Sequence, residues 1–409
     1  MKNKYNKLTD LNLLYDSYIA SMKGSFWKKE PQKFSIDFLS EIIKLKNELE
    51  NHTYKTLDGS EFTLNERGKI RHIHASRMRD RVVRHALCDG ELNDALSPYL
   101  IYNNGASQKG KGISFTRKMF EKDLHNFWLK HHTNDGYIGF IDFSKFYDNV
   151  RHDKVKELVL PKLSEEGKWI FNEVLKTMEV DVSYMTDEEY SQCLETKFDS
   201  LWYYKNIPKS MRTGEKMMAK GLGIGDQVSQ SIGIFFPTLI DNYVKIVRGC
   251  KWYGRYMDDM YIICKNKEEL ISIINGIIEI TQKIGMYINH KKTKIIKLSN
   301  QYKFLQIKYS LNKKGKVIKK INPKSVTRER RRIKAYKRLF DLEKLPYKDI
   351  ENACRSWMGE YSKIMSKKQI QHIKDLYFKF FDKELIWKRK LYLKMERKLQ
   401  QNKMEHVTS

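Results

Sequence analysis

The chain has 409 residues, and its 78 Lys and Arg exceed its 50 Asp and Glu by enough to give a formal net charge of +28. A surplus of this size indicates a polyanionic partner, because the chain repels itself unless negative charge screens it. The hydrophobic fraction of 41% excludes wholesale disorder, and 21 Gly with 7 Pro exclude collagen-like or low-complexity architecture.

Neither a membrane span nor a disulfide framework is indicated. No stretch of 18 apolar residues occurs, and the polar N-terminus lacks the apolar segment of a secretory signal. The five cysteines are scattered, odd in number and without a CxxC pair, so a zinc site is not indicated either. We therefore expect a cytoplasmic protein with no membrane partner.

The first part of the chain is predicted to be helical and then strand-like. Apolar positions recur at helical spacing from about residue 8 to residue 49. Between residues 54 and 73 the pattern becomes short and β-like, with a turn at Arg67-Gly68. A basic helix is expected to follow from Ser76 to about Leu96.

The central part combines apolar strands with helices. One apolar strand covers 137–142, and a glycine-rich turn at 221–225 opens a helix that is expected to reach about residue 248. Two short apolar strands then flank Asp258-Asp259, and a helix over 267–284 follows. Because this order contains no regular βαβ series, it predicts an α+β fold with at least two layers.

The last part is predicted to be helical and very basic. Residues 313–340 contain thirteen Lys and Arg and one acid, Glu329, whereas a solvated helix face usually mixes signs. We expect this segment to bind nucleic acid through side chains that include Arg328, Arg331 and Arg332, with an affinity that falls steeply with salt. A final helix over about 368–401 is interpreted as amphipathic and packed on its neighbours, with a surface for RNA or protein as the alternative.

Two adjacent carboxylates, Asp258 and Asp259, stand between the central apolar strands. They repel each other and favour water, so a hairpin turn is a poor place for both unless a cation neutralises them. Mg²⁺ binds through one or two carboxylates plus phosphate oxygens, and a two-metal phosphoryl-transfer site needs a further carboxylate from another element. Asp142, at the end of an apolar strand, is the candidate. A simple polar turn is the alternative interpretation.

Three segments together resemble the catalytic motifs of reverse transcriptases. Tyr256-Met257-Asp258-Asp259 looks like the family signature, and residues 139–150 resemble the first catalytic motif. Residues 221–230 resemble the second palm motif, in the form found in diversity-generating retroelements and related bacterial reverse transcriptases. Because the three motifs occur in order across most of the chain, the resemblance is specific.

The resemblance implies a right-hand polymerase that extends a primer on an RNA template. Its expected domains are an N-terminal helical extension at 1–50, fingers at 51–135, a palm at 136–312 with an insertion at about 157–215, and a basic helical thumb with a C-terminal helix at 313–409. The implied partners are an RNA template, the cDNA product and dNTPs, and an oligomer or an accessory protein is compatible with the sequence.

The resemblance also implies a metal site. Asp142 and Asp258 would bind two Mg²⁺ ions, for which Mn²⁺ is a substitute. Asp259 would be the second carboxylate of the pair, and Phe143 would offer its backbone carbonyl. Tyr147 stands where the family places a bulky steric gate that disfavours a ribose 2′-OH. An ordinary buried aromatic is the alternative for Tyr147.

Cations in the fingers segment are expected to meet the incoming nucleotide. Lys69 and Arg71 alternate with apolar residues, so both face one side of a strand and could hold the triphosphate as negative charge develops. A solvated strand face is the alternative. Ile224 stands where many reverse transcriptases have a Gln beside the incoming nucleotide, and we expect lower base-selection fidelity as a result.

Further cations are expected to contact the template or its phosphates. Arg81, Arg84 and His85 lie on the predicted helix after the strands. Lys109 and Lys111 belong to a glycine-containing segment that resembles another part of the family's fingers and suits backbone contact.

Downstream of the carboxylates, two segments resemble later family motifs. Lys291, Lys292 and Lys294 belong to one that is similar to the fourth motif, where a lysine would lie near the leaving pyrophosphate; the sequence leaves open which. Phe304-Leu305-Gln306 stands at the primer-grip turn, where the family normally has Gly in the third place.

Two biological roles stay open. The long segment between the first two motifs and the unusual Gly223 favour antiviral defence with a structured noncoding RNA as template. The motif ending Ser229-Gln230 favours mutagenic copying in a diversity-generating retroelement. A non-catalytic RNA-binding scaffold is a third interpretation, and the intact carboxylates argue against it.

Overall fold

The computed structural model describes residues 7–388, apart from residues 67, 201 and 203–205. Its contacts divide the chain into two compact units, one of residues 1–127 with 136–297 and one of residues 128–135 with 298–409. Each unit has a hydrophobic core of its own. The mixture of helices and small antiparallel sheets confirms the predicted α+β class.

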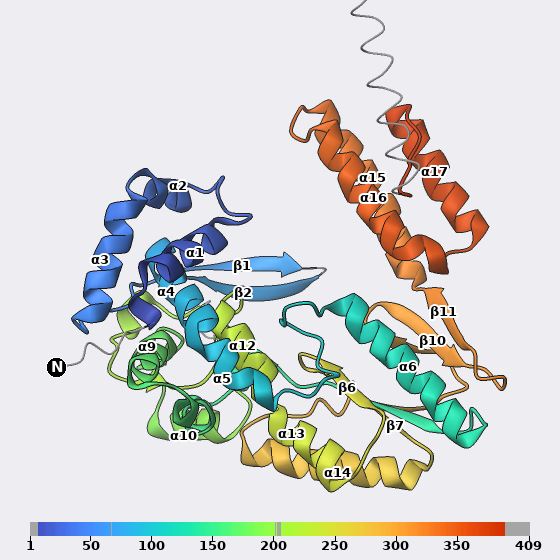
Figure 1. The fold of residues 1–409 in the computed structure, drawn as a ribbon, viewed down its shortest axis with the longest axis horizontal. Helices are drawn as coiled ribbons and strands as arrows, with labels where there is room; N and C mark the ends of the chain where they lie inside the picture. Colours follow the sequence, from blue (N-terminus) through green and yellow to red (C-terminus); the bar gives the residue numbers. More distant parts are fainter. Residues whose placement is uncertain (1–6, 67, 201, 203–205, 389–409) are drawn as a thin grey trace, which may run out of the picture. The chain divides into compact units, whose positions relative to one another are not determined.

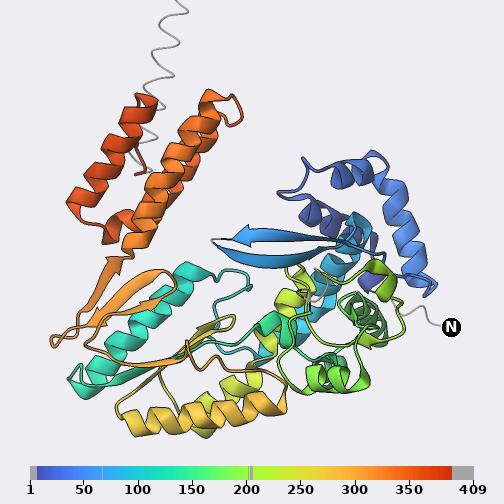
Figure 2. The same cartoon turned by 180° about the vertical axis from the view of Figure 1, so that it is seen from behind.

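Three helices and a long hairpin begin the first unit (Figure 2). Their bounds are α1 Leu11–Met22, α2 Lys29–Ile36, α3 Phe38–Glu50, β1 Ser60–Glu66 and β2 Lys69–Ala75. Asp10 starts α1 because its side chain accepts a hydrogen bond from the Leu13 N–H. Tyr18 of α1 stacks on Phe38, with ring centroids 5.1 Å apart, so the first and third helices share one core.

The helices after the hairpin carry the core toward the central sheet. They are α4 Met78–Leu87, α5 Asn93–Leu96 and α6 Ile113–His131. The strand-like pattern expected at residue 54 is wrong, because the chain there has no strand partner among the described residues. Tyr54 is instead a buried anchor whose hydroxyl donates to Asp80 Oδ1 of α4 at 2.8 Å.

A four-stranded antiparallel sheet holds the centre of the first unit (Figure 1). Its order is β6 Tyr253–Tyr256, β7 Asp259–Cys264, β3 Tyr137–Ile141 and β8 Lys294–Lys297. Helix α14, Lys267–Lys283, covers one face so closely that a Cβ on Gly139 would lie 3.1 Å from the Leu270 side chain. Phe120 of α6 covers the other face, edge-on to Tyr261 at 4.8 Å. Burial on both faces explains the continuous apolar run of β3.

The chain between β3 and β6 is mostly helical. Its elements are α7 Phe146–Asn149, α8 His152–Val159, α9 Glu165–Lys176, β4 Val180–Asp181, α10 Asp187–Glu195, β5 Met217–Met218, α12 Gln227–Phe235 and α13 Thr238–Asn242. Strands β4 and β5 pair, and a small core of their own forms around Val182 and Phe198. The single helix expected up to residue 248 is wrong, because Pro237 lacks the N–H that would continue α12.

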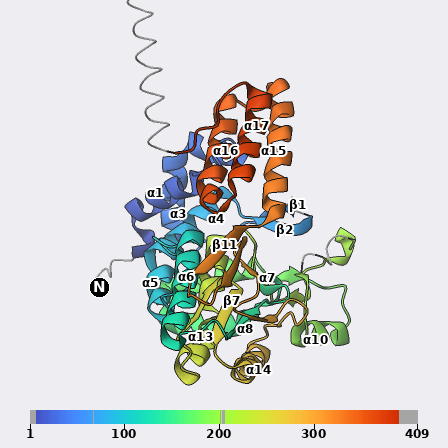
Figure 3. The same cartoon turned by 90° about the vertical axis from the view of Figure 1, so that its right-hand side faces the viewer.

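The second unit consists of a small sheet and three helices (Figure 3). The strands are β9 Tyr302–Phe304, β10 Ile307–Leu311 and β11 Val317–Ile321, and the helices are α15 Pro323–Asp341, α16 Tyr347–Tyr361 and α17 Lys367–Phe381. Trp128 ties the short segment before β3 to this unit by donating its indole N–H to the Lys313 carbonyl at 3.1 Å. In the tight turn between β9 and β10, Gln306 has a φ of 73°, a left-handed value that suits the family's usual Gly.

The predicted C-terminal helix is shorter than expected. It ends at Phe381, because Asp382 adopts a left-handed conformation with a φ of 51°. The chain then brings Leu385 into the core of the unit, and Trp387 donates its indole N–H to Ser362 Oγ at 3.0 Å. The remainder of that prediction, from residue 389, lies outside the described residues. Among the described helices, none combines the length and apolar character of a membrane span.

Candidate active site

The hairpin of β6 and β7 separates the two adjacent carboxylates. Tyr256 pairs with Asp259, so Met257 and Asp258 form a two-residue turn, in which Met257 has a φ of 54°. Asp258 is half-buried, whereas Asp259, the first residue of β7, is exposed. Their neighbourhood in the sequence therefore does not make them equivalent.

Asp142 reaches the same place from the next strand. It directly follows β3, which is antiparallel to β7, with Ile141 opposite Met260. Burial raises the pKa of Asp258 above its ordinary value, and the negative charge of Asp142 raises it further. Because Ile141 lies opposite Met260, the strand register places Asp142 beside the Asp258-Asp259 turn, although these residues lie far apart in the sequence.

Lys292 is the lysine of the fourth-motif segment that reaches these carboxylates. Its Nζ lies 2.9 Å from Asp142 Oδ2. The backbone supports this contact, because the Asn289 N–H donates to the Asp142 carbonyl at 2.8 Å. Ser144 N–H donates to the Tyr287 carbonyl at 2.7 Å, which joins the segment to the chain beside Phe143, itself buried.

The pair of carboxylates fits a divalent cation. Asp142 and Asp258 offer hard oxygen ligands of the kind that Mg²⁺ prefers, and their mutual repulsion would be relieved by a bound cation. Among the described residues, no group of three or more His, Cys, Asp and Glu side chains is gathered closely enough to hold a metal, so the role of Asp259 as a further ligand stays a prediction. The structure brings Asp142 and Asp258 together and leaves Asp259 on an exposed strand end.

A buried ion pair supports the turn that carries Asp258. Arg255 is fully buried and donates to both carboxylate oxygens of Asp241, at 2.8 to 3.0 Å. It also donates to the Met257 carbonyl at 3.4 Å, and Tyr253 donates its hydroxyl to Asp241 Oδ1 at 2.6 Å. This pair was not predicted from the sequence. The available signal was an Arg inside an apolar strand, since a buried charge requires a partner.

Tyr147 of α7 lies against the same turn. Its hydroxyl contacts Met257 Sδ at 3.8 Å, and burial followed by the charge of Asp258 raises the pKa of Tyr147. A Cβ on Gly233 of α12 would lie 3.0 Å from the Tyr147 hydroxyl, so the absence of a side chain there leaves room for the ring. The Leu222 N–H donates to the Tyr147 carbonyl at 2.7 Å, which connects the first motif to the second.

The second motif is held by a buried ion pair to α4. Asp226 caps α12 by accepting from the Val228 N–H at 2.9 Å, and it is paired with Arg84. Arg84 also donates to Thr177 Oγ1 at 2.7 Å and is only 3% exposed. The expectation that Arg84 contacts a template is therefore corrected, because its charge is used inside the protein. Ile224 lies half-buried in the turn before Asp226.

Some cations of the fingers segment are exposed, and others are hydrogen-bonded or ion-paired within the protein. Lys69 and Arg71 are exposed on one side of β2, although Arg71 is paired with Glu66 at 2.6 Å. Lys109 is exposed. Lys111 instead donates to the carbonyls of Tyr102 at 2.9 Å and Asn104 at 3.3 Å, and burial lowers its pKa, so it holds its own loop together.

The basic helix α15 shows the same division. Arg328 and Arg331 are exposed. Arg332 is paired with the buried Glu329 at 2.7 Å and lies over the Tyr336 ring, with its guanidinium 5.6 Å from the ring centroid. Only the first two present their charge fully to solvent.

Comparison with known proteins identifies the family. Residues 63–309, more than half of the chain, match the family described as reverse transcriptase (RNA-dependent DNA polymerase). The chain belongs to the reverse transcriptase family. The match begins within β1 and ends within β10, so it includes the central sheet and both carboxylates but none of α1–α3 or α15–α17.

Solved structures add a more distant likeness. Apo telomerase from Candida tropicalis is similar with a TM-score of 0.40 and 15% sequence identity, over 80% of this chain and 63% of that one. The chain thus spans less than two thirds of the length of that telomerase. No curated protein matches the chain.

Proposed function

We propose that the protein is an RNA-directed DNA polymerase that synthesises cDNA from dNTPs on an RNA template. The observation that carries this proposal is the meeting of Asp142 and Asp258 on neighbouring strands inside the segment that matches the family. Two half-buried carboxylates, one in a hairpin turn and one at the end of the neighbouring strand, do not stabilise the fold, because like charges repel. The same arrangement is well suited to holding Mg²⁺ beside a phosphate.

The proposed ligands of two Mg²⁺ ions are Asp142 and Asp258, with the Phe143 carbonyl and Asp259 completing the set. When bound, such ions stabilise the attacking and leaving oxygens of nucleotidyl transfer. Lys292 offsets the charge of Asp142 in the protein alone, and this contact supports it as the lysine that would meet the leaving pyrophosphate.

The remaining roles follow from exposure. Lys69 and Arg71, which protrude from β2, would bind the triphosphate, and the ring of Tyr147 would exclude a ribose 2′-OH. Arg81 and Lys109 would contact the template, and the exposed arginines of α15 would contact the duplex. We propose fingers at 51–135, a palm at 136–312 and a thumb from residue 313 for these parts.

Primer extension on an RNA template with Mg²⁺ tests the polymerase proposal. Asp258→Asn keeps the size of the side chain and removes its charge. We expect the rate of primer extension to fall by roughly 1000-fold, which corresponds to a loss of about 4 kcal/mol of transition-state stabilisation. Glu188→Gln, an exposed change on α10, is the control and should extend like the wild type. Equal extension by Asp258→Asn, or no extension by the wild type with Mg²⁺ or Mn²⁺, would contradict the proposal.

For the biological role, we propose antiviral defence with a dedicated noncoding RNA as template. The long segment between the first two motifs supports it, because its later part, residues 180–198, packs in a small core of its own and offers surface beyond the central sheet. Sequencing the RNA and cDNA that co-purify with the wild type and with Asp258→Ala/Asp259→Ala tests the proposal. One discrete RNA with Asp-dependent cDNA is expected. Mutated copies of a repeat would indicate diversification, and cDNA-free RNA in both proteins would indicate a scaffold.

A further inference from the structure

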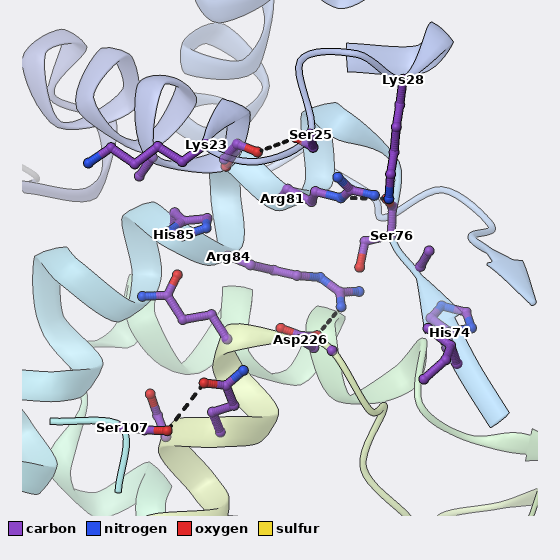
Figure 4. A pocket seen from close by; sticks show the side chains of 18 of the residues that line it. Lys23, Ser25, Lys28, His74, Ser76, Arg81, Arg84, His85, Ser107 and Asp226 are labelled. Atoms are coloured by element: carbon purple, nitrogen blue, oxygen red, sulfur yellow. Dashed lines mark hydrogen bonds and ion pairs between the residues drawn. The ribbon is translucent and has the colours of Figure 1, made fainter. Parts of the chain in front are cut away.

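A polar pocket lies in the first unit, lined by three separate regions of the chain (Figure 4). Its volume is about 560 Å³, within the range of small-ligand sites. One wall is the end of α1 and the loop after it, another is β2 with α4, and the floor is the turn at Gly225 with the start of α12. The first wall belongs to a part of the chain that precedes the family match, which begins at residue 63.

The lining carries more positive charge than the protein itself neutralises. Asp226 is the acid among the lining residues, and it is already paired with Arg84. Arg81 donates its Nε to the Ser76 carbonyl at 3.0 Å, and its terminal nitrogens have no acceptor among the described residues. Lys23 and Lys28, both exposed, add two charges from the loop after α1 without a carboxylate partner in the described part of the chain.

The neutral side chains of the lining also favour a phosphate- and sugar-bearing ligand. Hydroxyls and amides predominate: Ser21, Ser25, Ser76, Ser107, Ser231, Asn93, Gln227 and Gln230. Several of them are already paired with one another, such as Ser107 with Gln230 and Ser231 with Asn93. Hydroxyls and amides can nevertheless both donate to and accept from a ribose-phosphate segment, which an apolar ligand cannot exploit.

We propose that this pocket binds single-stranded RNA of the template, and that the loop residues Lys23 and Lys28 form a phosphate-binding wall specific to this chain's N-terminal helices. The inference rests on the proposed function for the identity of the strand. The floor supports it, because Gly225 and Asp226 directly follow Ile224, the residue expected beside the incoming nucleotide. A strand held there enters next to the templating position.

The arrangement of charge favours a strand over a free nucleotide. Lys23 and Lys28 extend from different points of the loop, and Lys28 extends toward Arg81 of α4 (Figure 4). Lys28 and Arg81 together suit one phosphate and Lys23, which extends in another direction, suits a second, so the charge fits successive phosphates of a backbone better than one triphosphate, which needs all cations to converge. Phe62, half exposed at the rim, offers a ring on which a base can stack.

Equilibrium binding of the full chain to labelled primed templates tests the inference. One substrate carries a 5′ RNA overhang of about ten nucleotides, and the other is the same duplex with a blunt end. For Lys23→Gln/Lys28→Gln we expect about tenfold weaker binding of the overhang substrate at low salt and a salt slope smaller by roughly 1.4, because two single-strand phosphate contacts are lost. Binding of the blunt substrate should stay as in the wild type.

Lys29→Gln/Lys33→Gln is the matched control, because it removes two exposed charges from adjacent α2 outside this pocket. An equal loss in the control, an equal loss on the blunt duplex, or no loss at all would overturn the inference. So would displacement of the overhang by dATP in the wild type, since the pocket would then hold a nucleotide. Apart from the dATP competition, the binding assay contains no dNTP, and none of its measurements contains metal, so a failure of polymerase activity would leave its result intact.

Discussion

In the first unit, side chains that are close in the sequence have different functions because one is buried and the other is exposed to solvent. Asp258 and Asp259 are neighbours, yet Asp258 is half-buried and its pKa is raised by burial and by the charge of Asp142, whereas Asp259 is exposed. Arg81 and Arg84 are one helical turn apart, yet Arg84 is neutralised inside the protein while Arg81 keeps unsatisfied donors. Within each pair the two residues have the same chemistry and the same motif, so only the direction in which each side chain points distinguishes their functions.

The ring of Tyr147 should determine sugar selection. Tyr147→Ala removes the ring beside Met257, and we expect discrimination against ribonucleotides to fall by about 100-fold, since the clash with a 2′-OH disappears. Tyr147→Phe keeps the ring and loses only the hydroxyl contact, so it should discriminate like the wild type. Single-nucleotide incorporation with matched dNTP and rNTP measures both. If the Ala variant discriminates against ribonucleotides as well as the wild type does, Tyr147 is an ordinary buried aromatic residue and not a steric gate.

Ile224 should lower fidelity, because its side chain cannot hydrogen-bond near the nucleotide. In Ile224→Gln we expect misincorporation to fall by about tenfold, which corresponds to roughly 1.4 kcal/mol, the net contribution of one ordinary hydrogen bond. Ile224→Met, which changes shape without adding a polar group, is the control. An error rate in Ile224→Gln that equals that of the wild type would reject the hypothesis.

Buried ion pairs between helices and strands hold the elements of the site in fixed positions. The Arg255–Asp241 pair fixes the β6–β7 turn to the chain after α12, and the Arg84–Asp226 pair fixes the start of α12 to α4. Breaking such a pair by removing one partner costs about 3–5 kcal/mol, because the other charge stays buried. These elements therefore form one framework around Asp142 and Asp258.

A buried lysine caps the C-terminal end of helix α10, and its titration should make the stability of the segment between the motifs depend on pH. Lys220 Nζ donates to the carbonyls at the end of this helix, which belong to Cys193, Leu194 and Thr196. Burial lowers the pKa of Lys220 from 10.5 to about 8. Between these values the unfolded chain holds a proton that the folded protein has released, so unfolding takes up a proton and stability rises with pH.

The measurement is urea unfolding of the wild type and of Lys220→Met between pH 7.5 and 9.5. The difference in unfolding free energy should move in favour of the wild type by about 1 kcal/mol per pH unit, because other titrations cancel between the two proteins. Below pH 8 both states of Lys220 are charged and the difference should be flat. A difference that is flat throughout would show that the amine reaches water.

Across the chain, the surplus of +28 divides into charge that is used internally and charge that remains for nucleic acid. In α15, Arg328 and Arg331 are exposed, whereas Arg332 pairs with Glu329. Counting charges along the helix overstates the surface available to a phosphate backbone.

We expect Arg328→Gln/Arg331→Gln to weaken binding of an RNA–DNA duplex and to reduce its salt slope by roughly 1.8, since each duplex phosphate contact contributes about 0.9. Arg332→Gln should leave the slope unchanged and lower the stability of the second unit, because it leaves Glu329 buried without its partner. Salt titrations of binding and thermal unfolding compare them. A larger slope change in Arg332→Gln than in the double variant would reverse the assignment.

Local pattern sufficed for much of this protein. The apolar strand before Asp142, the hairpin around Asp258 and the helices of the basic C-terminal part were readable because periodicity and turn residues act over a few positions. The errors at Tyr54 and Asp382 arise where the chain packs against distant elements, whereas the break at Pro237 is local, because proline lacks the N–H that would continue the helix.

The order of the motifs and the positive net charge were enough to predict the family, the α+β class and the carboxylates of the site, because both can be read directly from the sequence. Only the tertiary structure decided which lysine meets Asp142, which arginines are neutralised and that α1 joins a pocket with α12. The physical reason is that these contacts join residues far apart in the chain, and no local spacing encodes the direction in which a side chain becomes buried.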